Sequence, residues 1–309
     1  ATWRRINEPS KEVAVFSFLY QAITNSTKQI KRTAVVCISL VSTALVLYSP
    51  NTGAWGQNGH RIIGQIALNH LTPTAKGKVE ALLSGDKLPE VTTWADEMRS
   101  SPDEFWQKKS SKWHYISINK WQEFKPSKYE LPYHDEPADL YAAILKSITV
   151  LQTPSSSAAD KEFYLRFLTH LIGDLHMPLH VGRSEDRGGN RIDVTFFGEE
   201  TNLHTLWDTK LIESQNLSFK EFTAFIDTNE PRQISGYLST GVKDWIKESY
   251  DHAQDIYDVG EADFRWNYQY QYMPLVKTRL LQGGIRLAGI LNKIFDPAAE
   301  PGKQAIAKL

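Results

Sequence analysis

Histidine and aspartate recur at a four-residue spacing in two segments of the chain. The stretch HLIGDLHMPLH contains His170 and Asp174, and the stretch HTLWD contains His204 and Asp208. On a helix, residues four apart share a face and lie about 6 Å apart along the axis, so each pair can ligate one ion or two neighbouring ions. Imidazole and carboxylate groups are common ligands of divalent metal ions. Each pair alone is more often a surface pair on a helix, so the two segments indicate a metal site only together with further ligands.

Other residues extend this candidate site. His180 follows Pro178, which ends the first helix and allows the chain to turn back towards it. Asp96 and His114 each lie near a tryptophan in the sequence, which suits a ligand held in an apolar wall, and His60 completes the set. The set exceeds what one tetrahedral ion can use. Because it contains nitrogen and oxygen donors but no thiolate, it favours zinc, with manganese or iron as alternatives.

The elements that must position these residues are predicted to be helices. Apolar residues recur at three- and four-residue spacings, the period of an amphipathic helix, and Thr72 with Pro73 and, further on, Ser157 are typical helix starts. The helical stretches are residues 60–71, 75–83, 139–151, 161–176 and 273–295. In the strand-like stretch GGNRIDVTFFG, apolar residues alternate between glycines, so we expect a short β-hairpin near 188–198. We predict an all-α fold: a single, mostly helical domain over 55–309.

The charge of the chain argues against a basic nucleic-acid clamp. Its 309 residues are 41% hydrophobic and 23% charged, which is ordinary for a globular protein. The formal net charge is −1, but residues 1–54 contain six Lys/Arg and only two Asp/Glu. Of 35 basic and 36 acidic residues, the rest of the chain keeps 29 and 34, and is mildly acidic. We expect such a body to recognise phosphate through metal ions rather than through a lysine-rich surface.

Residues 28–54 are predicted to be a secretory signal. Three basic residues precede an apolar run over 33–48, and the small residues Thr52 and Ala54 precede a cleavage site before Trp55. A retained membrane anchor is the alternative, but the run contains serine and threonine and is shorter than the roughly 20 apolar residues of a span. We expect a secreted or periplasmic protein that has no membrane attachment once the signal is removed.

The single cysteine, Cys37, lies inside the predicted signal. The mature chain would therefore contain no disulfide and would depend on its core and its metals for stability. Residues 1–27 form an extension whose composition we do not interpret.

Seven motifs occur in the order seen in one known family. They are WGQNGH, WADEMR, WHYIS, HLIGDLHMPLH, GGNRIDV, NLHTLWD and GGIRLAGILN, and they span nearly all of residues 55–296. The chain thereby resembles the zinc-dependent single-strand nucleases (class I, S1/P1 type) of fungi, plants and bacteria. The resemblance implies a mostly helical domain with three zinc ions, one of them bound by the free amino group and carbonyl of an N-terminal tryptophan. Removal of a signal before Trp55 would create that ligand.

The resemblance assigns ligands to all three zinc ions, and Asp174 bridges two of them. The three sets are Asp96, His114, His170 and Asp174; Trp55, His60 and Asp174; and His180, His204 and Asp208. The other histidines are interpreted as supporting or surface residues, because lone histidines usually have structural roles. They are His70, His134, His176 and His252.

The same resemblance implies the reaction. A metal-activated hydroxide would hydrolyse single-stranded DNA and RNA to products with 5′-phosphates, and 3′-nucleotidase activity on nucleotides would extend this reaction. Asp96 and Asp174 would lie at the reaction centre, and Arg99 would stabilise the charge of the transition state. Tyr115 would stack on a base, and Asn190 would shape the substrate pocket. We expect a monomer without a stable protein partner.

Two positions depart from the family pattern. Ser117 stands where fungal members have an acidic residue near the attacking water, which affects the expected rate and pH optimum. Lys210 stands where fungal relatives have a tyrosine, so the base preference does not transfer. We keep both as candidate substrate-binding residues.

Two other functions remain open at this point. A zinc phospholipase C resembles this family in fold and ligands, but it would need an apolar loop that docks on membranes, and the sequence has no clear one. A non-catalytic periplasmic zinc-binding protein would need the ligands but neither Arg99 nor a substrate wall. Metal chaperones also usually expose their ligands on mobile, low-complexity segments, whereas these lie on predicted packed helices.

Overall fold

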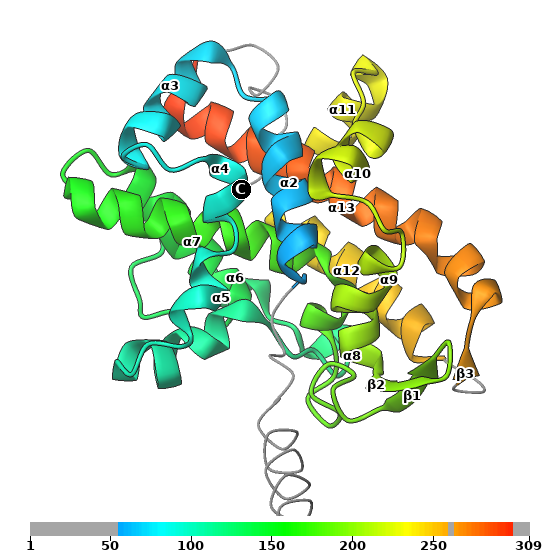
Figure 1. The fold of residues 1–309 in the computed structure, drawn as a ribbon. Coiled ribbons are helices and arrows are strands. Elements are labelled where there is room, and N and C mark those ends of the chain that lie inside the picture. Colours follow the sequence, from blue (N-terminus) through cyan, green and yellow to red (C-terminus); the bar gives the residue numbers. More distant parts are fainter. Residues whose placement is uncertain (1–54, 259–262, 299–309) are drawn as a thin grey trace, which may run out of the picture. The chain divides into compact units, whose positions relative to one another are not determined.

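Two helices begin at caps that the sequence predicts. The computed structural model describes residues 55–258 and 263–298 (Figure 1). Helix α3 (Pro73–Leu82) starts after Thr72, whose side chain accepts a hydrogen bond from the backbone N–H of Ala75. Helix α7 (Ala158–His176) starts after Ser157, which accepts one from Asp160 in the same way. These bonds satisfy N–H groups that a helix start leaves without a partner, and both predictions are confirmed.

Helices α2 (Gln57–Asn69) and α13 (Trp266–Phe295) pack along each other, and Figure 1 shows blue α2 crossing orange-to-red α13. Ile62, Ile63 and Ile66 of α2 are fully buried. A Cβ at Gly284 would overlap the side chain of Ile66, so glycine allows the close approach of these two helices. Helix α6 (Leu140–Gln152) packs along α7, which also contacts α2 and α13. This helical core is the frame of the candidate site.

A small sheet interrupts the helices. Strand β1 (Asp193–Phe196) pairs antiparallel with β2 (Glu199–Asn202) and parallel with β3 (Asp263–Phe264). The predicted hairpin is therefore present, but residues 184–191 form turns and its second strand follows the predicted stretch. The sequence of β2, EETN, lacks the apolar alternation of a half-buried strand, and β3 is too short to show a period.

The remaining elements are shorter helices and turns between these parts, together with α12 against the end of α7. They are α4 (Leu88–Val91), α5 (Trp94–Met98), η2 (Phe105–Lys109), η3 (Ser110–His114), η4 (Trp121–Glu123), η5 (Pro126–Lys128), η6 (Pro178–Val181), α8 (Leu203–Thr205), η7 (Leu206–Lys210), α9 (Leu211–Glu213), α10 (Phe219–Ile226), α11 (Pro231–Leu238) and α12 (Val242–Tyr257). The mostly helical fold that the sequence predicts is confirmed. Among the described residues, no helix has both the length and the apolar character needed to cross a bilayer.

Helix α13 starts seven residues before the predicted residue 273, and Pro274 lies inside it. Proline removes one helical hydrogen bond, the one that Tyr270 would accept. Tyr270 is 87% exposed, so water can hydrate this part of the helix and the helix continues. The described residues belong to one compact unit. The predicted extension 1–27 and signal 28–54 lie outside the described residues.

Candidate metal centre and substrate cleft

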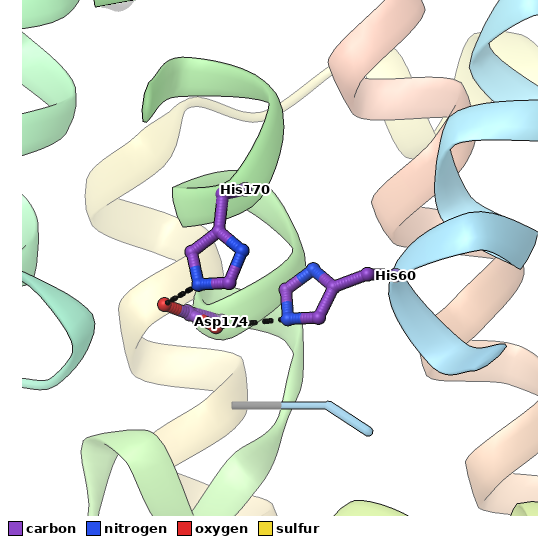
Figure 2. A group of neighbouring side chains, drawn as sticks. All are labelled: His60, His170 and Asp174. Atoms are coloured by element: carbon purple, nitrogen blue, oxygen red, sulfur yellow. Dashed lines mark ion pairs between the residues drawn. The ribbon is translucent and has the colours of Figure 1, made fainter. Parts of the chain in front are cut away.

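Helices α2 and α7 bring His60, His170 and Asp174 together (Figure 2). The Oδ2 atom of Asp174 lies 3.2 Å from Nε2 of His170, and its Oδ1 atom lies 3.3 Å from Nε2 of His60. All three side chains are fully buried. A Cβ at Gly173 would lie 2.6 Å from Nδ1 of His60, so the close approach of the two helices here requires glycine. The two oxygens of one carboxylate thus face different imidazoles.

Two further residues join the Oδ2 side of Asp174. His114, the last residue of η3, places Nδ1 3.1 Å from Oδ2 of Asp174. Asp96, on the short helix α5, places Oδ1 3.8 Å from both His114 Nδ1 and His170 Nε2. The structure therefore assembles Asp96, His114 and His170 around Oδ2 of Asp174, which is the grouping that the resemblance assigns to one ion.

A second cluster combines His180, His204 and Asp208, whose donor atoms lie within 4.8 Å of one another. His180 lies in η6 after the end of α7, and the other two lie on the consecutive turns α8 and η7. The two imidazole rings are stacked with their centroids 5.0 Å apart. His180 Nδ1 also lies 3.8 Å from Oδ1 of Asp174, so this cluster adjoins the first one.

Main-chain carbonyl groups orient three of these imidazoles. His170 Nδ1 bonds the carbonyl of Thr92 at 2.7 Å, His180 Nδ1 bonds that of His114 at 2.5 Å, and His204 Nδ1 bonds that of Gly188 at 2.7 Å. A donating Nδ1 leaves Nε2 as the ligand atom of a neutral ring. Sequence reasoning missed these partners because every residue carries a carbonyl. Only the GGN motif, which contains Gly188 at φ +63°, hinted at an unusual turn here.

Burial keeps most of these imidazoles neutral. Burial, with the neighbouring charge of His170, lowers the pKa of His60 to about 4, and burial with the charge of His180 lowers the pKa of His204 to about 3. Burial also lowers the pKa of His170, but the charges of Asp174 and Asp96 outweigh this effect and raise it to about 9. Burial raises the pKa of Asp208 well above its ordinary value. A cation among these groups would relieve the cost of burying the carboxylate.

Several buried polar atoms at this centre have no hydrogen-bond partner. Among the described residues, the orphaned atoms include both ring nitrogens of His60, Nε2 of His114, Oδ1 of Asp174, Nε2 of His180 and Oδ1 of Asp208. Buried polar atoms without a partner are rare because each costs free energy. Their concentration in two adjacent clusters of nitrogen and oxygen donors fits the binding of divalent cations.

The metal centre opens into a cleft of about 660 Å³. Arg99, Tyr115, Ser117 and Asn190 line it together with the ligands His114, His180 and His204. Arg99 places Nη1 3.5 Å from Oδ1 of Asp96, and Tyr115 is 47% exposed. The structure therefore brings four of the five predicted residues beside the ligands to one cleft. Lys210 does not line it, because its ammonium pairs with Glu199 of the β-hairpin at 3.0 Å.

Trp55 is fully buried and lies two residues before α2, the helix that carries His60. The next residue, Gly56, donates its N–H to the carbonyl of Asp208 at 2.7 Å, which connects the segment before α2 to the second cluster. His176 is fully buried. Its ring nitrogens bond the carbonyl of Ile172 on α7 and the guanidinium of Arg286 on α13, so His176 connects these two helices.

Comparisons with known proteins agree with this geometry. The model of the S1/P1 nuclease family matches residues 55–296. Endonuclease 2 of Arabidopsis thaliana is 31% identical over 290 residues, which cover 84% of this chain and 97% of the relative. Nuclease S1 of Aspergillus oryzae is 29% identical over 234 residues, which cover 73% and 77%. Nuclease P1 of Penicillium citrinum is 31% identical over 203 residues, which cover 62% and 72%. The chain belongs to the S1/P1 nuclease family. It is a nuclease, an enzyme of the hydrolase class.

Proposed function

We propose that the protein is an exported zinc-dependent endonuclease that hydrolyses single-stranded DNA and RNA to 5′-phosphorylated products. The bridging geometry of Asp174 supports this most directly: its two oxygens face two sets of imidazoles at the floor of an open cleft. This arrangement can hold two cations beside each other, which is the geometry needed to act on one phosphodiester. A terminal 3′-phosphate offers the same chemistry, so the proposal includes 3′-nucleotidase activity.

The residues divide among three ions. Asp96, His114, His170 and Asp174 would hold one ion, His60 and Asp174 with the main chain of Trp55 a second, and His180, His204 and Asp208 a third. Bound divalent cations supply Lewis-acid activation of water and stabilise the charge that develops on a phosphodiester. The all-nitrogen-and-oxygen donor set suits zinc.

Side chains around the centre bind and orient the substrate. Arg99 stands over the carboxylate of Asp96 at the cleft, where its guanidinium can neutralise a phosphate oxygen. Tyr115 presents an exposed ring on which a base can stack. Asn190 lines the cleft and donates to the carbonyl of Arg187 at 2.9 Å, and its Oδ1 has no hydrogen-bond partner among the described residues, so Asn190 has an acceptor left for a substrate group that reaches the wall of the cleft. Ser117 takes no proton in this scheme, because a serine hydroxyl is not a base near neutral pH.

Export would also complete the second ion's ligands. We propose that a signal over residues 28–54 is removed before Trp55, which frees an α-amino group. The position of Trp55 supports this, because its neighbour Gly56 bonds the main chain of Asp208 and because Trp55 lies two residues before α2, the helix that carries His60. The proposed location is outside the cytoplasm, either secreted or periplasmic.

The test uses protein that begins at Trp55, incubated with a single-stranded oligonucleotide before and after chelation and after zinc is added back. We expect chelator-sensitive release of 5′-phosphorylated nucleotides, identified by mass spectrometry, and about three zinc ions per chain by elemental analysis. The same samples are assayed on phosphatidylcholine vesicles. Release of a phosphorylated headgroup with an intact oligonucleotide would favour a phospholipase C, and zinc binding without either reaction would favour a binding protein.

A further inference from the structure

A second cleft adjoins the one above the metal centre. It encloses about 360 Å³ and shares Tyr115, Ile116 and Ser117 with the first cleft. The rest of its lining comes mainly from residues 118–139 and includes Lys112. The two clefts therefore meet at Tyr115, the residue directly after the ligand His114.

An extended segment connects the two clefts. Ile116 and Ile118 are buried, and their N–H groups bond main-chain carbonyls of the segment that follows α7, at 2.9 and 3.0 Å. Tyr115, Ser117 and Asn119 between and beside them are exposed. Since side chains of extended backbone alternate in direction, these three project on one face. This face leads from the metal centre into the second cleft.

The second cleft carries lysines that form no close ion pair with another described residue. The side chains of Lys112, Lys125 and Lys128 are exposed and, among the described residues, none of them has an ion pair within 4 Å or a hydrogen bond. The charge of Lys128 does act on Asp139 of the same cleft, at a distance longer than an ion pair. Other surface lysines do pair within 4 Å, as Lys108 does with Glu104 and Lys247 with Asp251. The positive charge of the cleft is thus available to an anionic ligand.

The acidic groups in the same cleft oppose this charge only in part. Glu123 is exposed beside the lysines, whereas Asp139 is engaged as the cap of α6. Its carboxylate accepts hydrogen bonds from the hydroxyl of Tyr129 at 2.6 Å and from the N–H of Ala142 at 3.0 Å. The three lysines therefore outnumber the carboxylates of the lining, although the chain as a whole is near neutral.

Aromatic rings form one wall of this cleft. The rings of Phe124 and Tyr129 lie 5.7 Å apart and nearly parallel, and Trp121 contacts Phe124 from outside the cleft lining at 4.9 Å. The hydrogen bond to Asp139 fixes the Tyr129 ring. Cationic groups beside fixed aromatic rings are the combination that binds single-stranded nucleic acid, because the former attract phosphates and the latter stack on bases.

We propose that the second cleft is a strand-binding groove for the nucleotides that flank the scissile phosphodiester. Its lysines contact phosphates of a single strand, its aromatic wall contacts bases, and the strand passes Tyr115 into the metal centre. This inference rests on the proposed nuclease function. It makes the enzyme favour substrates longer than a dinucleotide, and it gives long substrates a salt dependence that the metal centre alone does not produce.

The test compares a dinucleotide, which reaches only the metal centre, with a single-stranded dodecamer. The Lys125→Ala/Lys128→Ala variant should raise the KM for the dodecamer about 5- to 10-fold and leave kcat/KM for the dinucleotide within about twofold of wild type. The dependence of log kcat/KM on log salt for the dodecamer should become shallower by about 1.4, or about 0.7 for each lysine. Two control variants should match wild type. Lys125→Arg/Lys128→Arg keeps the positive charge of the cleft. Lys243→Ala/Lys277→Ala removes two exposed lysines that line neither cleft.

The outcomes separate the groove from the nuclease function. An unchanged dodecamer KM, or an equal loss on both substrates, would overturn the groove while dinucleotide cleavage still supports the nuclease. If the wild type cleaves neither substrate, the nuclease function fails, and fluorescence anisotropy with a labelled dodecamer decides the groove by itself. In that measurement the Lys→Ala variant should bind about 5- to 10-fold more weakly than the two controls, and equal binding would refute the groove.

Discussion

The imidazole rings of His60 and His170 stack with their centroids 4.0 Å apart and their planes 12° from parallel, although the residues lie on different helices. Both Nε2 atoms face the carboxylate of Asp174, at 3.3 and 3.2 Å. Two imidazolium ions at this separation would repel each other, and this repulsion adds to the effect of burial in lowering the pKa of His60. The neutral ring that results is the form that ligates a metal ion.

The contact between α2 and α7 depends on Gly173. Alanine there would place a Cβ 2.6 Å from Nδ1 of His60, so Gly173→Ala should lower the free energy of unfolding by about 1–3 kcal/mol and weaken metal binding. Gly77→Ala is the matched control: Gly77 is also helical, and an added Cβ there would meet no described residue within 4 Å. It should stabilise the protein by about 0.5–1 kcal/mol. Thermal unfolding and elemental analysis measure both effects, and equal stabilities would contradict the role of Gly173.

Asp174 serves both sides of the first cluster. Asp174→Asn should therefore remove metal from the His60 side and from the His114 side, while the cluster of His180, His204 and Asp208 keeps its ion. Activity should fall by more than about 100-fold. The control is Asp251→Asn, an exposed residue paired with Lys247. Metal content that stays at the wild-type value in Asp174→Asn would show that Asp174 does not bridge.

Arg99 should act on the reaction without affecting metal binding. Arg99→Ala should lower kcat on a dinucleotide about 100- to 1000-fold, because it removes a charge beside the developing negative charge. Metal content should remain at the wild-type value, since Arg99 offers no ligand atom. Arg99→Lys keeps the charge and should retain part of the rate. A rate loss that is matched by loss of metal would assign Arg99 a structural role instead.

Substitutions of Tyr115 and of Lys210 should have different effects on the affinity for an oligonucleotide. Tyr115 is exposed on the cleft, so Tyr115→Ala should weaken oligonucleotide binding by about 1–3 kcal/mol, the value of one base stacked on an aromatic ring. Lys210 pairs with Glu199 away from the cleft, so Lys210→Ala should leave binding unchanged. Anisotropy titrations with a labelled oligonucleotide compare the two. Equal losses of affinity in the two variants would indicate that Lys210 does contact the substrate.

The stability of the metal-free protein should depend on pH through His204. Burial and the charge of His180 lower its pKa from 6.5 to about 3 in the folded chain. Between these values the unfolded chain binds a proton that the folded chain does not. The free energy of unfolding is therefore highest, as far as His204 determines it, above pH 6.5. It falls as the pH is lowered from 6.5 towards 3, because protonation of His204 then favours the unfolded chain.

Urea unfolding of chelated protein at about pH 7 and about pH 4.5 measures this effect. His204→Gln should lose less stability than wild type between the two pH values, because it lacks the titrating ring. The exposed residue His134 supplies the control His134→Gln, which should follow wild type. Identical losses in all three proteins would refute the assignment to His204.

The helical period made part of the site predictable. His170 and Asp174 are four residues apart on a helix, so their shared face follows from spacing alone. The approach of His60 does not follow from spacing, because it depends on how α2 packs on α7 over Gly173. For that grouping the sequence offered only the family resemblance.

Strands β2 and β3, the position of Lys210 and the second cleft could not be predicted from periodicity in the sequence. Strand β2 is polar and largely exposed, and β3 pairs over two residues with a strand far away in the sequence. The position of Lys210 depends on the hairpin, whose Glu199 holds its ammonium. The positive charge of the second cleft is not visible in the net charge of the chain, because its lysines belong to a domain that is mildly acidic as a whole.

The carbonyl groups of Thr92, His114 and Gly188 each hold the Nδ1 of a histidine. Because the orienting oxygens belong to the main chain, replacing the side chain of Thr92 leaves its hydrogen bond to His170 in place as long as the backbone keeps its path. The choice of tautomer is thereby encoded in the backbone trace and is largely independent of local side-chain identity. Homologues can diverge widely around the ligands and still present the same nitrogen atoms to the centre.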